Sequence, residues 1–206
     1  MKQFQCHCGN NVYFDSSVCV SCGSKLGYDP VEGEVLALAS HTEDTFTAIT
    51  SSGEVKTYKS CRNHVGYSVC NWLIEVDDYH ERCIACRLNR TIPNLTRPIN
   101  LTRWKALEKA KHRLVYTLLS LGLPVVSQWD DQENGLLFDF LEDLQEDVEV
   151  NEGFNLTGHS SGVITINVLE ADDVLRESMR TEMNESYRTL LGHFRHESGH
   201  YYWPML

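Results

Sequence analysis

Apolar and polar residues alternate over residues 34–60. A period of two places successive side chains on opposite faces of a strand, so this pattern is typical of strands with one buried face. The turn-prone sequence Ser51-Ser52-Gly53 separates the last two apolar runs. The pattern therefore predicts two or three short antiparallel strands. Their apolar positions are Val35, Leu36 and Leu38, then Phe46, Ala48 and Ile49, then Val55, Thr57 and Tyr58.

Residues 102–121 show helical spacing of apolar residues instead of the alternation seen over residues 34–60. Apolar residues recur there at intervals of three and four, and Gly122 and Pro124 follow as a stop signal, so we predict a helix with a buried stripe. The stripe consists of Trp104, Leu107, Lys111, Leu114, Val115 and Leu118.

A domain boundary is predicted before this helix. Residues 87–100 contain Pro93 and Pro98, which disfavour helix, and they predict an extended linker. We place residues 1–92 in one region and residues 93–206 in another. The second region has strand-like runs at 135–140 and 157–167, a short helix opening at 170–173 and a final helix over 184–203. The predicted fold class is α+β.

The final helix separates two kinds of residue. At about 100° per residue, one stripe is apolar and a neighbouring face carries His193, His196, Glu197 and His200. A helix attached to a core by one stripe, with polar groups beside it, suits an active site. The apolar stripe comprises Tyr187, Leu190, Leu191, Phe194 and Tyr201.

The sequence His196-Glu197-Ser-Gly-His200 has the pattern H-E-x-x-H. Residues four apart share a helix face, so His196 and His200 can bind one zinc ion, with Glu197 facing the same space. Zinc lowers the pKa of a bound water, and the carboxylate accepts its proton during attack on a carbonyl. The alternative is a solvated helix rich in histidine.

Two sets of four cysteines lie in the first region. The first set pairs Cys6-His-Cys8-Gly with Cys19-Val-Ser-Cys22-Gly, and glycine permits the unusual backbone angles of a metal-binding turn. We expect one tetrahedral zinc there, with disulfides as the alternative. So small a module has little core, so the metal would supply most of its folding free energy.

The second set consists of Cys61, Cys70, Cys83 and Cys86. Its first spacing is loose, so His64 or His80 could compete as ligands, although an all-cysteine site is favoured. The two sets use all eight cysteines. Because no cysteine is left over, two structural zinc sites are favoured over a catalytic cysteine. Cysteines that bind metal indicate a reducing compartment.

The composition of the chain limits the classes of binding partner that are expected. The net charge of −11 disfavours a nucleic-acid backbone as main partner, although Lys and Arg at 97–113 could form a local basic patch. Ten acidic residues between 130 and 152 indicate a solvated loop region. The sequence predicts no N-terminal targeting segment and no membrane span, so a cytoplasmic protein is expected.

Several stretches resemble a bacterial family of zinc-dependent metallopeptidases with an N-terminal zinc-ribbon domain. The resemblance covers nearly the whole chain. It implies a zincin-like catalytic domain with His196 and His200 as zinc ligands and Glu197 as general base, and zinc held by the upstream cysteines. The stretches are RLNRTIP (87–93), LVYTLLSLGLP (114–124), Gly158-His159 with ITIN (164–167), and residues 187–203.

The third ligand of the catalytic zinc is not identified. Members of the family continue past the H-E-x-x-H helix, and zincins take this ligand from downstream, so we expect a truncated peptidase domain or a ligand from elsewhere. One straight helix cannot wrap His193, His196 and His200 around one ion with tetrahedral geometry. His159 or an acidic side chain from 139–152 would need a fold that the sequence does not predict.

The leading hypothesis is a zinc metallopeptidase that hydrolyses peptide bonds of a peptide or protein substrate. Strand 157–167 could pair with an extended peptide above the metal, or it could be internal. Tyr201 or Tyr202 could stabilise an oxyanion, although core packing is favoured for both. The alternative function is a non-catalytic zinc-ribbon module that binds a protein partner. Substrate and oligomeric state do not follow from the sequence.

Overall fold

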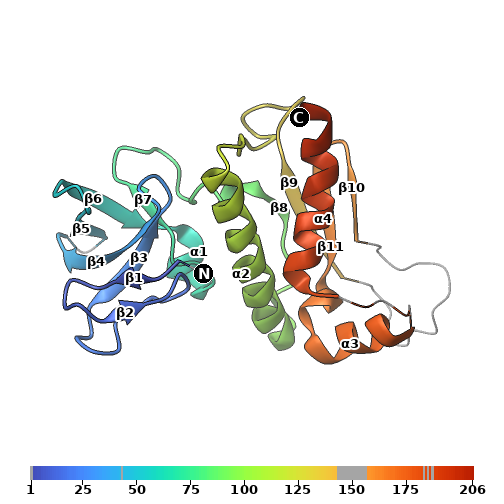
Figure 1. Cartoon of the computed structure of the whole chain (residues 1–206), viewed down its shortest axis with the longest axis horizontal. Coiled ribbons are helices and arrows are strands. Elements are labelled where there is room, and N and C mark those ends of the chain that lie inside the picture. The colour runs from blue at the N-terminus through green and yellow to red at the C-terminus, as the bar shows by residue number, and fades with distance from the viewer. Residues whose placement is uncertain (1, 43, 143–156, 183, 185, 187) are drawn as a thin grey trace. The chain divides into compact units, whose positions relative to one another are not determined.

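The structure is a computed structural model that describes residues 2–42, 44–142, 157–182, 184, 186 and 188–206. The chain forms two compact units, Met1–Cys86 and Arg87–Leu206, called here the first and second units (Figure 1). Residues 143–152 of the acidic stretch lie outside the described residues, as does Tyr187 of the predicted apolar stripe. Within the described part of the chain, none of the helices combines the length and apolarity needed to cross a bilayer.

The first unit is built from short antiparallel strands and one short helix. β1 and β2 form a two-stranded sheet, and five further strands form a sheet in the order β3-β4-β5-β6-β7. The elements are β1 (Phe4–Gln5), β2 (Asn11–Val12), β3 (Lys25–Asp29), β4 (Glu34–Ser40), β5 (Thr45–Ile49), β6 (Val55–Ser60), α1 (Arg62–Tyr67) and β7 (Leu73–Glu75). The strands predicted over 34–60 are confirmed as β4, β5 and β6.

The five-stranded sheet closes on itself. Tyr28 of β3 forms a parallel bridge with Trp72, and its N–H donates to the Asn71 carbonyl at 2.8 Å, so β3 meets β7. Gly27 makes this approach possible, because a Cβ there would lie 2.4 Å from Leu73 Cδ2. Leu73 packs in a small buried cluster with Leu36, Ala48 and Tyr58, so the core of this unit lies between the strands.

The second unit combines a four-stranded sheet with helices. The sheet has the order β10-β11-β9-β8, in which β8, β9 and β11 are parallel and β10 is antiparallel to β11. The elements are β8 (Asn89–Thr91), α2 (Pro98–Ser120), β9 (Leu137–Leu141), β10 (Gly158–Ser160), β11 (Val163–Asn167), α3 (Asp173–Glu182) and α4 (Leu190–Tyr202), with 3₁₀ turns η1 (Cys86–Leu88), η2 (Val168–Ala171) and η3 (Trp203–Met205).

The first long helix begins earlier than predicted. α2 starts at Pro98 rather than at residue 102. Proline is tolerated in the first turn of a helix, because the N–H that it lacks would have no partner within the helix there. The prediction of an extended linker was therefore wrong for residues 98–100, and residues 89–91 form β8 instead.

Both long helices of this unit cover the same face of the sheet. Phe138 and Phe140 lie two residues apart on β9, so their side chains point to one face. Their ring centroids lie 5.6 and 6.1 Å from that of Phe194 in α4. The Lys111 ammonium of α2 lies 6.0 and 5.6 Å from the same two rings. α4 therefore faces β9 through Phe194, which is fully buried, and Tyr201 of the predicted stripe is buried as well.

Lys111 is fully buried and so is its partner Glu108. Lys111 Nζ lies 2.9 Å from Glu108 Oε2 and also donates to the Asn89 side chain. Glu108 accepts from Trp104 Nε1 at 2.9 Å and from Asn89. This polar network ties β8 to α2. It also explains how a lysine occupies a position that helical spacing assigns to the buried stripe.

The predicted strand over 157–167 is a hairpin of two strands. Ser161 and Gly162 turn the chain, with φ of 47° and 78°. β11 lies between β9 and β10, so it is internal, and its pairing with an added peptide is excluded by its neighbours. β10 is the edge strand of the described sheet. A further strand could therefore pair with β10, residues 158–160, but not with β11.

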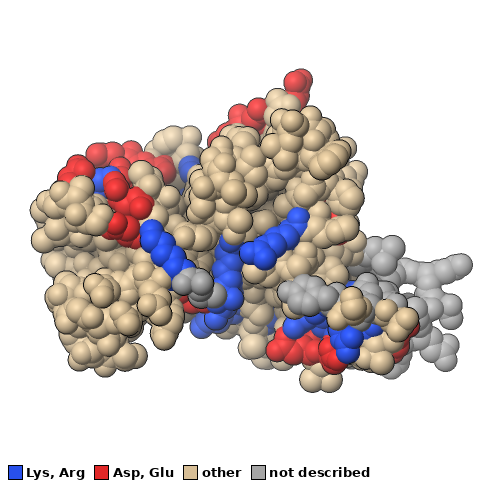
Figure 2. All heavy atoms as spheres, viewed as in Figure 1, with Lys and Arg blue, Asp and Glu red and all other residues tan. Residues whose placement is uncertain are grey.

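The last two helices differ in how they are held. α3 has no buried residue. Its surface carries the ion pairs Arg176–Asp173 and Arg180–Glu177. Figure 2 accordingly shows acidic and basic side chains close together over this helix. α4 begins at Leu190 rather than at residue 184. The Thr189 side chain accepts the Gly192 N–H at 3.0 Å and caps its first turn.

Candidate metal centres

The first cysteine set converges on one point. The ligand atoms of Cys6, Cys8, Cys19 and Cys22 all lie within 4.8 Å of one another. Cys6 Sγ is 3.6 Å from Cys22 Sγ, and Cys8 Sγ is 3.7 Å from Cys19 Sγ. Two sulfurs at 2.3 Å from a tetrahedral zinc are about 3.8 Å apart, so the arrangement fits zinc and not disulfides.

The turns that carry these thiols are local. The Gly9 N–H donates to the Cys6 carbonyl at 2.8 Å, and the Gly23 N–H donates to the Cys19 carbonyl at 2.9 Å. Both glycines have positive φ, which the predicted knuckles require. Burial raises the pKa of Cys6 to about 12, whereas hydrogen bonds from Ser24 lower the pKa of Cys22 to about 6.

The second cysteine set is enclosed. Cys61, Cys70, Cys83 and Cys86 are all buried, and their ligand atoms also lie within 4.8 Å of one another. The Cys83 N–H points to Cys61 Sγ at 3.4 Å, and hydrogen bonds from the other three thiols hold the pKa of Cys61 well below its usual value. Donors aimed at sulfur stabilise thiolate, which is the form that binds zinc.

The two competing histidines face other partners. His64 Nδ1 lies 2.6 Å from the Cys70 carbonyl oxygen, and His80 Nδ1 lies 2.6 Å from Asp78 Oδ1. The ligand group contains four cysteines and neither histidine. The structure thus favours the all-cysteine alternative.

The two histidines of the H-E-x-x-H motif point at each other. His196 Nε2 and His200 Nε2 are 3.1 Å apart on the exposed side of α4. Two nitrogens at 2.0–2.1 Å from a tetrahedral zinc are about 3.3–3.4 Å apart, so the pair fits one ion. Glu197 is only 8% exposed and lies closer to the core than the histidines.

His193 is turned away from this pair. Its Nε2 lies 3.4 Å from Glu170 Oε2, and Glu170 also pairs with Arg188. Glu170 is buried at the end of the sheet, in η2. His193 lies on α4 one turn before His196, and its ring contacts the buried Glu170 rather than joining both motif histidines in one ligand group.

His159 of β10 lies next to the motif. Its ring centroid is 6.1 Å from that of Tyr201, and its Nε2 accepts the Gly162 N–H at 3.2 Å across the hairpin turn. Burial and then the charge of His200 lower its pKa, against a partly opposing effect of Glu197. His159 therefore has a structural role in the hairpin turn, and its ring also shares the electrostatic environment of the motif.

The two tyrosines after the motif hold a loop. The Tyr202 hydroxyl donates to the Pro124 carbonyl at 2.7 Å, and the Tyr201 hydroxyl donates to the Asn134 carbonyl. Burial raises the pKa of both phenols. Both rings are buried, so core packing was the better expectation for them.

No third donor completes the histidine pair in the described part of the chain. No carboxylate, thiol or imidazole of the described residues forms a group with both Nε2 atoms within 4.8 Å. The acidic residues at 143–152, which were weighed as ligands, lie outside the described residues.

Basic side chains gather over α2 in Figure 2. Several of them are neutralised locally, because Arg97 pairs with Glu142 at 3.1 Å and Arg103 lies 3.7 Å from Asp172. Lys111 is buried with Glu108 and cannot reach a ligand. The stretch 97–113 is therefore less cationic at its surface than its composition indicates.

Comparison with protein families gives two matches. Residues 100–206 match the family described as "Putative zinc-binding metallo-peptidase". The chain belongs to this family. Residues 3–97 match a zinc-ribbon domain, which agrees with the two four-cysteine clusters of the first unit. Zinc is thus supported both by the family and by the geometry of the thiols.

Relatives of this chain occur in mycobacteria. "Uncharacterized protein Rv2568c" of Mycobacterium tuberculosis and "Uncharacterized protein Mb2598c" of Mycobacterium bovis are each 38% identical over 207 residues. The alignments cover 100% of this chain and 54% of each relative, so the chain spans about half of their length. No solved structure matches the chain.

Proposed function

We propose that this chain carries the zinc-binding helix of a peptidase of the zincin type, which hydrolyses peptide bonds beside His196 and His200. The observation that carries the proposal is the 3.1 Å separation of the two Nε2 atoms, which suits two ligands of one zinc ion. A solvated helix rich in histidine has no reason to hold two imidazoles in this way, because two ring nitrogens without an ion gain little from such proximity.

Glu197 is the proposed general base. Zinc, when bound, would polarise the scissile carbonyl and favour deprotonation of water. Glu197 accepts a proton as the water oxygen joins the carbonyl carbon, and it passes that proton to the amine as the C–N bond breaks. Glu197 as a residue is 8% exposed, so it is largely shielded from bulk water.

The third ligand is proposed to come from outside the described residues. Zinc in a catalytic site normally has three protein ligands and one open position, and the described residues contribute two. A carboxylate or imidazole from elsewhere would complete the set without displacing Glu197.

The substrate is proposed to be an extended peptide added to the edge of β10. That strand pairs with β11 on one side, and His159 at its centre lies beside the α4 motif. Main-chain pairing at an open edge holds a peptide in extended form, and pockets then read alternate side chains. A peptide in that place would run past the two histidines.

A second candidate function has one specific observation in its favour. Since the described residues supply only two ligands at the motif, while both cysteine sets are complete, the chain could act as a zinc-ribbon module that captures a protein partner without cleaving it. In this alternative the second unit is an incomplete peptidase domain.

Zinc content and peptide cleavage distinguish the two functions. Elemental analysis should give about three zinc ions per chain, falling to about two in the His196→Ala/His200→Ala variant. Two ions in both proteins would mean that only the cysteine sites bind zinc in this chain, which is the result that the second candidate predicts.

Cleavage is measured with a library of quenched fluorescent peptides. Glu197→Gln preserves shape and the imidazole ligands, and it should reduce the rate by about 10²–10⁴-fold, the usual contribution of a general base. Glu133→Gln, on an exposed loop, is the matched control and should cleave normally. Equal cleavage by Glu197→Gln and the wild type would show that the assigned base is wrong. Partner capture that survives Glu197→Gln but not Cys19→Ser would favour the second candidate.

A further inference from the structure

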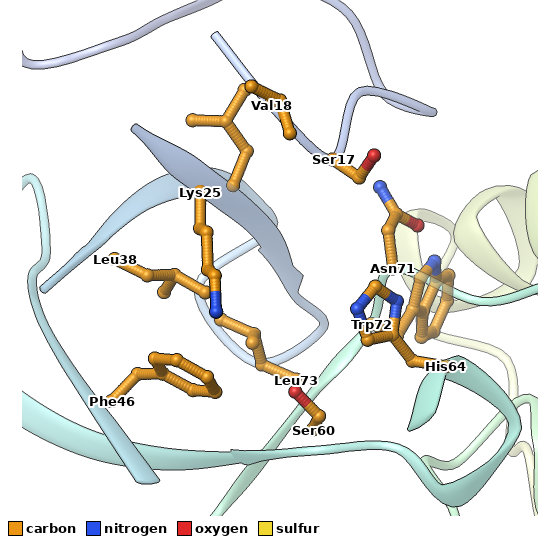
Figure 3. A pocket seen from close by; sticks show the side chains of 11 residues that line it. Ser17, Val18, Lys25, Leu38, Phe46, Ser60, His64, Asn71, Trp72 and Leu73 are labelled. Atoms are coloured by element: carbon orange, nitrogen blue, oxygen red, sulfur yellow. The ribbon is translucent and has the colours of Figure 1, made fainter. Parts of the chain in front are cut away.

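A pocket of about 160 Å³ lies in the first unit (Figure 3), and its lining includes Val18 and Ser60, which adjoin the cysteine ligands, but no cysteine. A cavity of about 150 Å³ is enough to hold benzene, so the pocket can take one aromatic ring or one branched aliphatic group. Its apolar wall includes Leu38, Phe46, Trp72 and Leu73. Neither the proposed peptidase chemistry nor the structural zinc sites make use of this space.

The apolar wall is held rigidly. Trp72 is 1% exposed, and Leu73 belongs to the buried cluster between the strands, against which Leu38 packs. Asn71 at the rim donates from its side chain to the carbonyls of Phe14 and Ser16, at 2.7 and 3.2 Å. A pocket with so little freedom to collapse keeps its shape when empty, which lowers the entropic cost of binding.

One cationic side chain enters the pocket. Figure 3 shows the Lys25 side chain extending from β3 into the ring of lining residues, and its Nζ lies 5.1 Å from the centroid of Phe46. In the part of the chain that the structure describes, Lys25 has no carboxylate partner, whereas Lys56 on the same sheet pairs with two.

The polar groups around Lys25 suit an anion. Ser17, Ser60, His64 and Asn71 are the other polar residues of the lining, which contains no Asp or Glu. In a chain with a net charge of −11, a pocket with an ammonium group, two hydroxyls and no carboxylate is a local exception. Such a set complements a single negative charge next to an apolar group.

We propose that this pocket binds an apolar carboxylate, with its aromatic or branched aliphatic group against Phe46 and Leu73 and its carboxylate paired with Lys25. A carboxylate fits better than a phosphate, because a phosphate dianion needs more than one cation and the wall is mostly apolar. Two sources offer this chemistry: the C-terminal residue of a peptide, and a free small acid. The site would give the first unit a binding function of its own.

The test uses the full zinc-loaded chain and N-acetyl-L-phenylalanine, with N-acetyl-L-phenylalaninamide as the neutral counterpart. Binding is followed by methyl NMR shifts of Leu38 and Leu73 and by calorimetry. The acid should bind at least about tenfold more tightly than the amide, because charge-assisted hydrogen bonds are the stronger kind. Equal affinity of the acid and the amide, or no binding of the acid at about 10 mM, would overturn the proposal.

The decisive variant is Lys25→Met, which keeps the length of the side chain and removes its charge. It should lose the preference for the acid, and Lys25→Arg should retain it. Lys2→Met is the matched control, since Lys2 also lies over a phenylalanine, 5.3 Å from the centroid of Phe4, outside the pocket. Unchanged zinc content and melting temperature show that a variant is folded. Undiminished acid binding by Lys25→Met would refute the assignment.

Peptides separate the two sources. A pentapeptide ending in a free phenylalanine that binds more tightly than N-acetyl-L-phenylalanine assigns the pocket to a peptide C-terminus. A pentapeptide that binds less tightly than the single residue assigns it to a small acid. Both results require the shifts to fall on Leu38 and Leu73. Shifts confined to the second unit would refute the pocket as the binding site.

Discussion

Replacing Lys111 with methionine should destabilise the second unit strongly and in a pH-dependent way. Lys111 and Glu108 are both fully buried, and their charged atoms are 2.9 Å apart. At an effective dielectric constant near 20, Coulomb's law gives about 6 kcal/mol for this pair. Lys111→Met removes that attraction and leaves a buried carboxylate among the Trp104 and Asn89 donors.

Protonation of Glu108 limits the cost in the variant. A glutamate with an unfolded pKa near 4.3 can become neutral at pH 7 for about 3.7 kcal/mol, and at pH 5.5 for about 1.6 kcal/mol. The free energy of unfolding should therefore fall by about 4 kcal/mol at pH 7, within the range of about 3–5 kcal/mol seen when one partner of a buried pair is removed. The loss should shrink to about 2 kcal/mol at pH 5.5.

The sign of the pH dependence differs between the two proteins. In the wild type burial disfavours the charge of Glu108, but Lys111, His112 and Asn89 outweigh it and lower the pKa. The ionised Glu108 therefore stabilises the fold at pH values above its unfolded pKa, and this stability is lost as the pH falls through its folded pKa. In Lys111→Met the effect of burial on Glu108 is no longer opposed by the lysine charge, so the pKa of Glu108 should rise. The variant should then gain stability between pH 7 and pH 5.5.

The measurement is urea unfolding followed by circular dichroism at the helical band, which reports mainly the second unit because it holds α2, α3 and α4. Lys105→Met, on the exposed side of α2, is the matched control and should change little. Lys111→Met/Glu108→Gln should abolish the pH dependence of the loss. A loss in Lys111→Met below about 1 kcal/mol, or one that is equal at both pH values, would refute the reasoning.

Three further predictions concern zinc and packing. Cys70→Ser should lower the zinc content by about one ion per chain and unfold the first unit, as checked by elemental analysis and circular dichroism; a folded variant with full zinc would contradict this. In the His196→Ala/His200→Ala variant, a chromogenic chelator should remove zinc in two phases, the faster from the cluster whose Cys8 and Cys22 are exposed, and a single phase would argue against two distinct cysteine sites. Tyr202→Phe should lose the hydrogen bond to Pro124 and about 0.5–1.5 kcal/mol of stability without changing zinc content, as measured by urea unfolding; zinc loss would place the hydroxyl in the metal site.

Local patterns predicted the elements that depend on near neighbours. The alternation over 34–60 corresponds to β4, β5 and β6, and helical spacing corresponds to the body of α2. The cysteine turns also follow local rules, since glycine after Cys8 and Cys22 adopts the positive φ that each turn requires. In these cases the sequence interval itself fixes which side chains share a face or a turn.

The misplaced boundaries have local causes that propensity alone does not resolve. Pro98 was taken as a helix breaker, but a proline at the first helical position is compatible with α2. The final helix was extended back to residue 184, whereas the Thr189 side chain caps it at Leu190. In both cases the effect of a residue depends on its position relative to the end of the helix, and the prediction did not take that position into account.

Other features depend on residues that are distant in the chain. Lys111 could be assigned to the buried face by spacing, but its ammonium group also donates a hydrogen bond to Asn89 of β8, in addition to its ion pair with Glu108. The direction of His193 could not be predicted, because its partner Glu170 lies 23 residues earlier in the chain and reaches it only through the fold. Long-range pairing of this kind leaves no periodic signal in a single sequence.

The same distinction separates the two four-cysteine sites from the proposed zinc site of the H-E-x-x-H motif. Each cysteine set is built from knuckles or short loops, so spacing predicts most of its ligands and the structure brings all four thiols together. The H-E-x-x-H motif supplies only the two ligands that one helix face can hold, because tetrahedral geometry prevents a third residue of the same straight helix from reaching the ion. In the proposed site, the remaining ligand would therefore come from another segment. A structural zinc site is local enough to be read from spacing, whereas a catalytic site that keeps one position open for water depends on the tertiary fold for its completion.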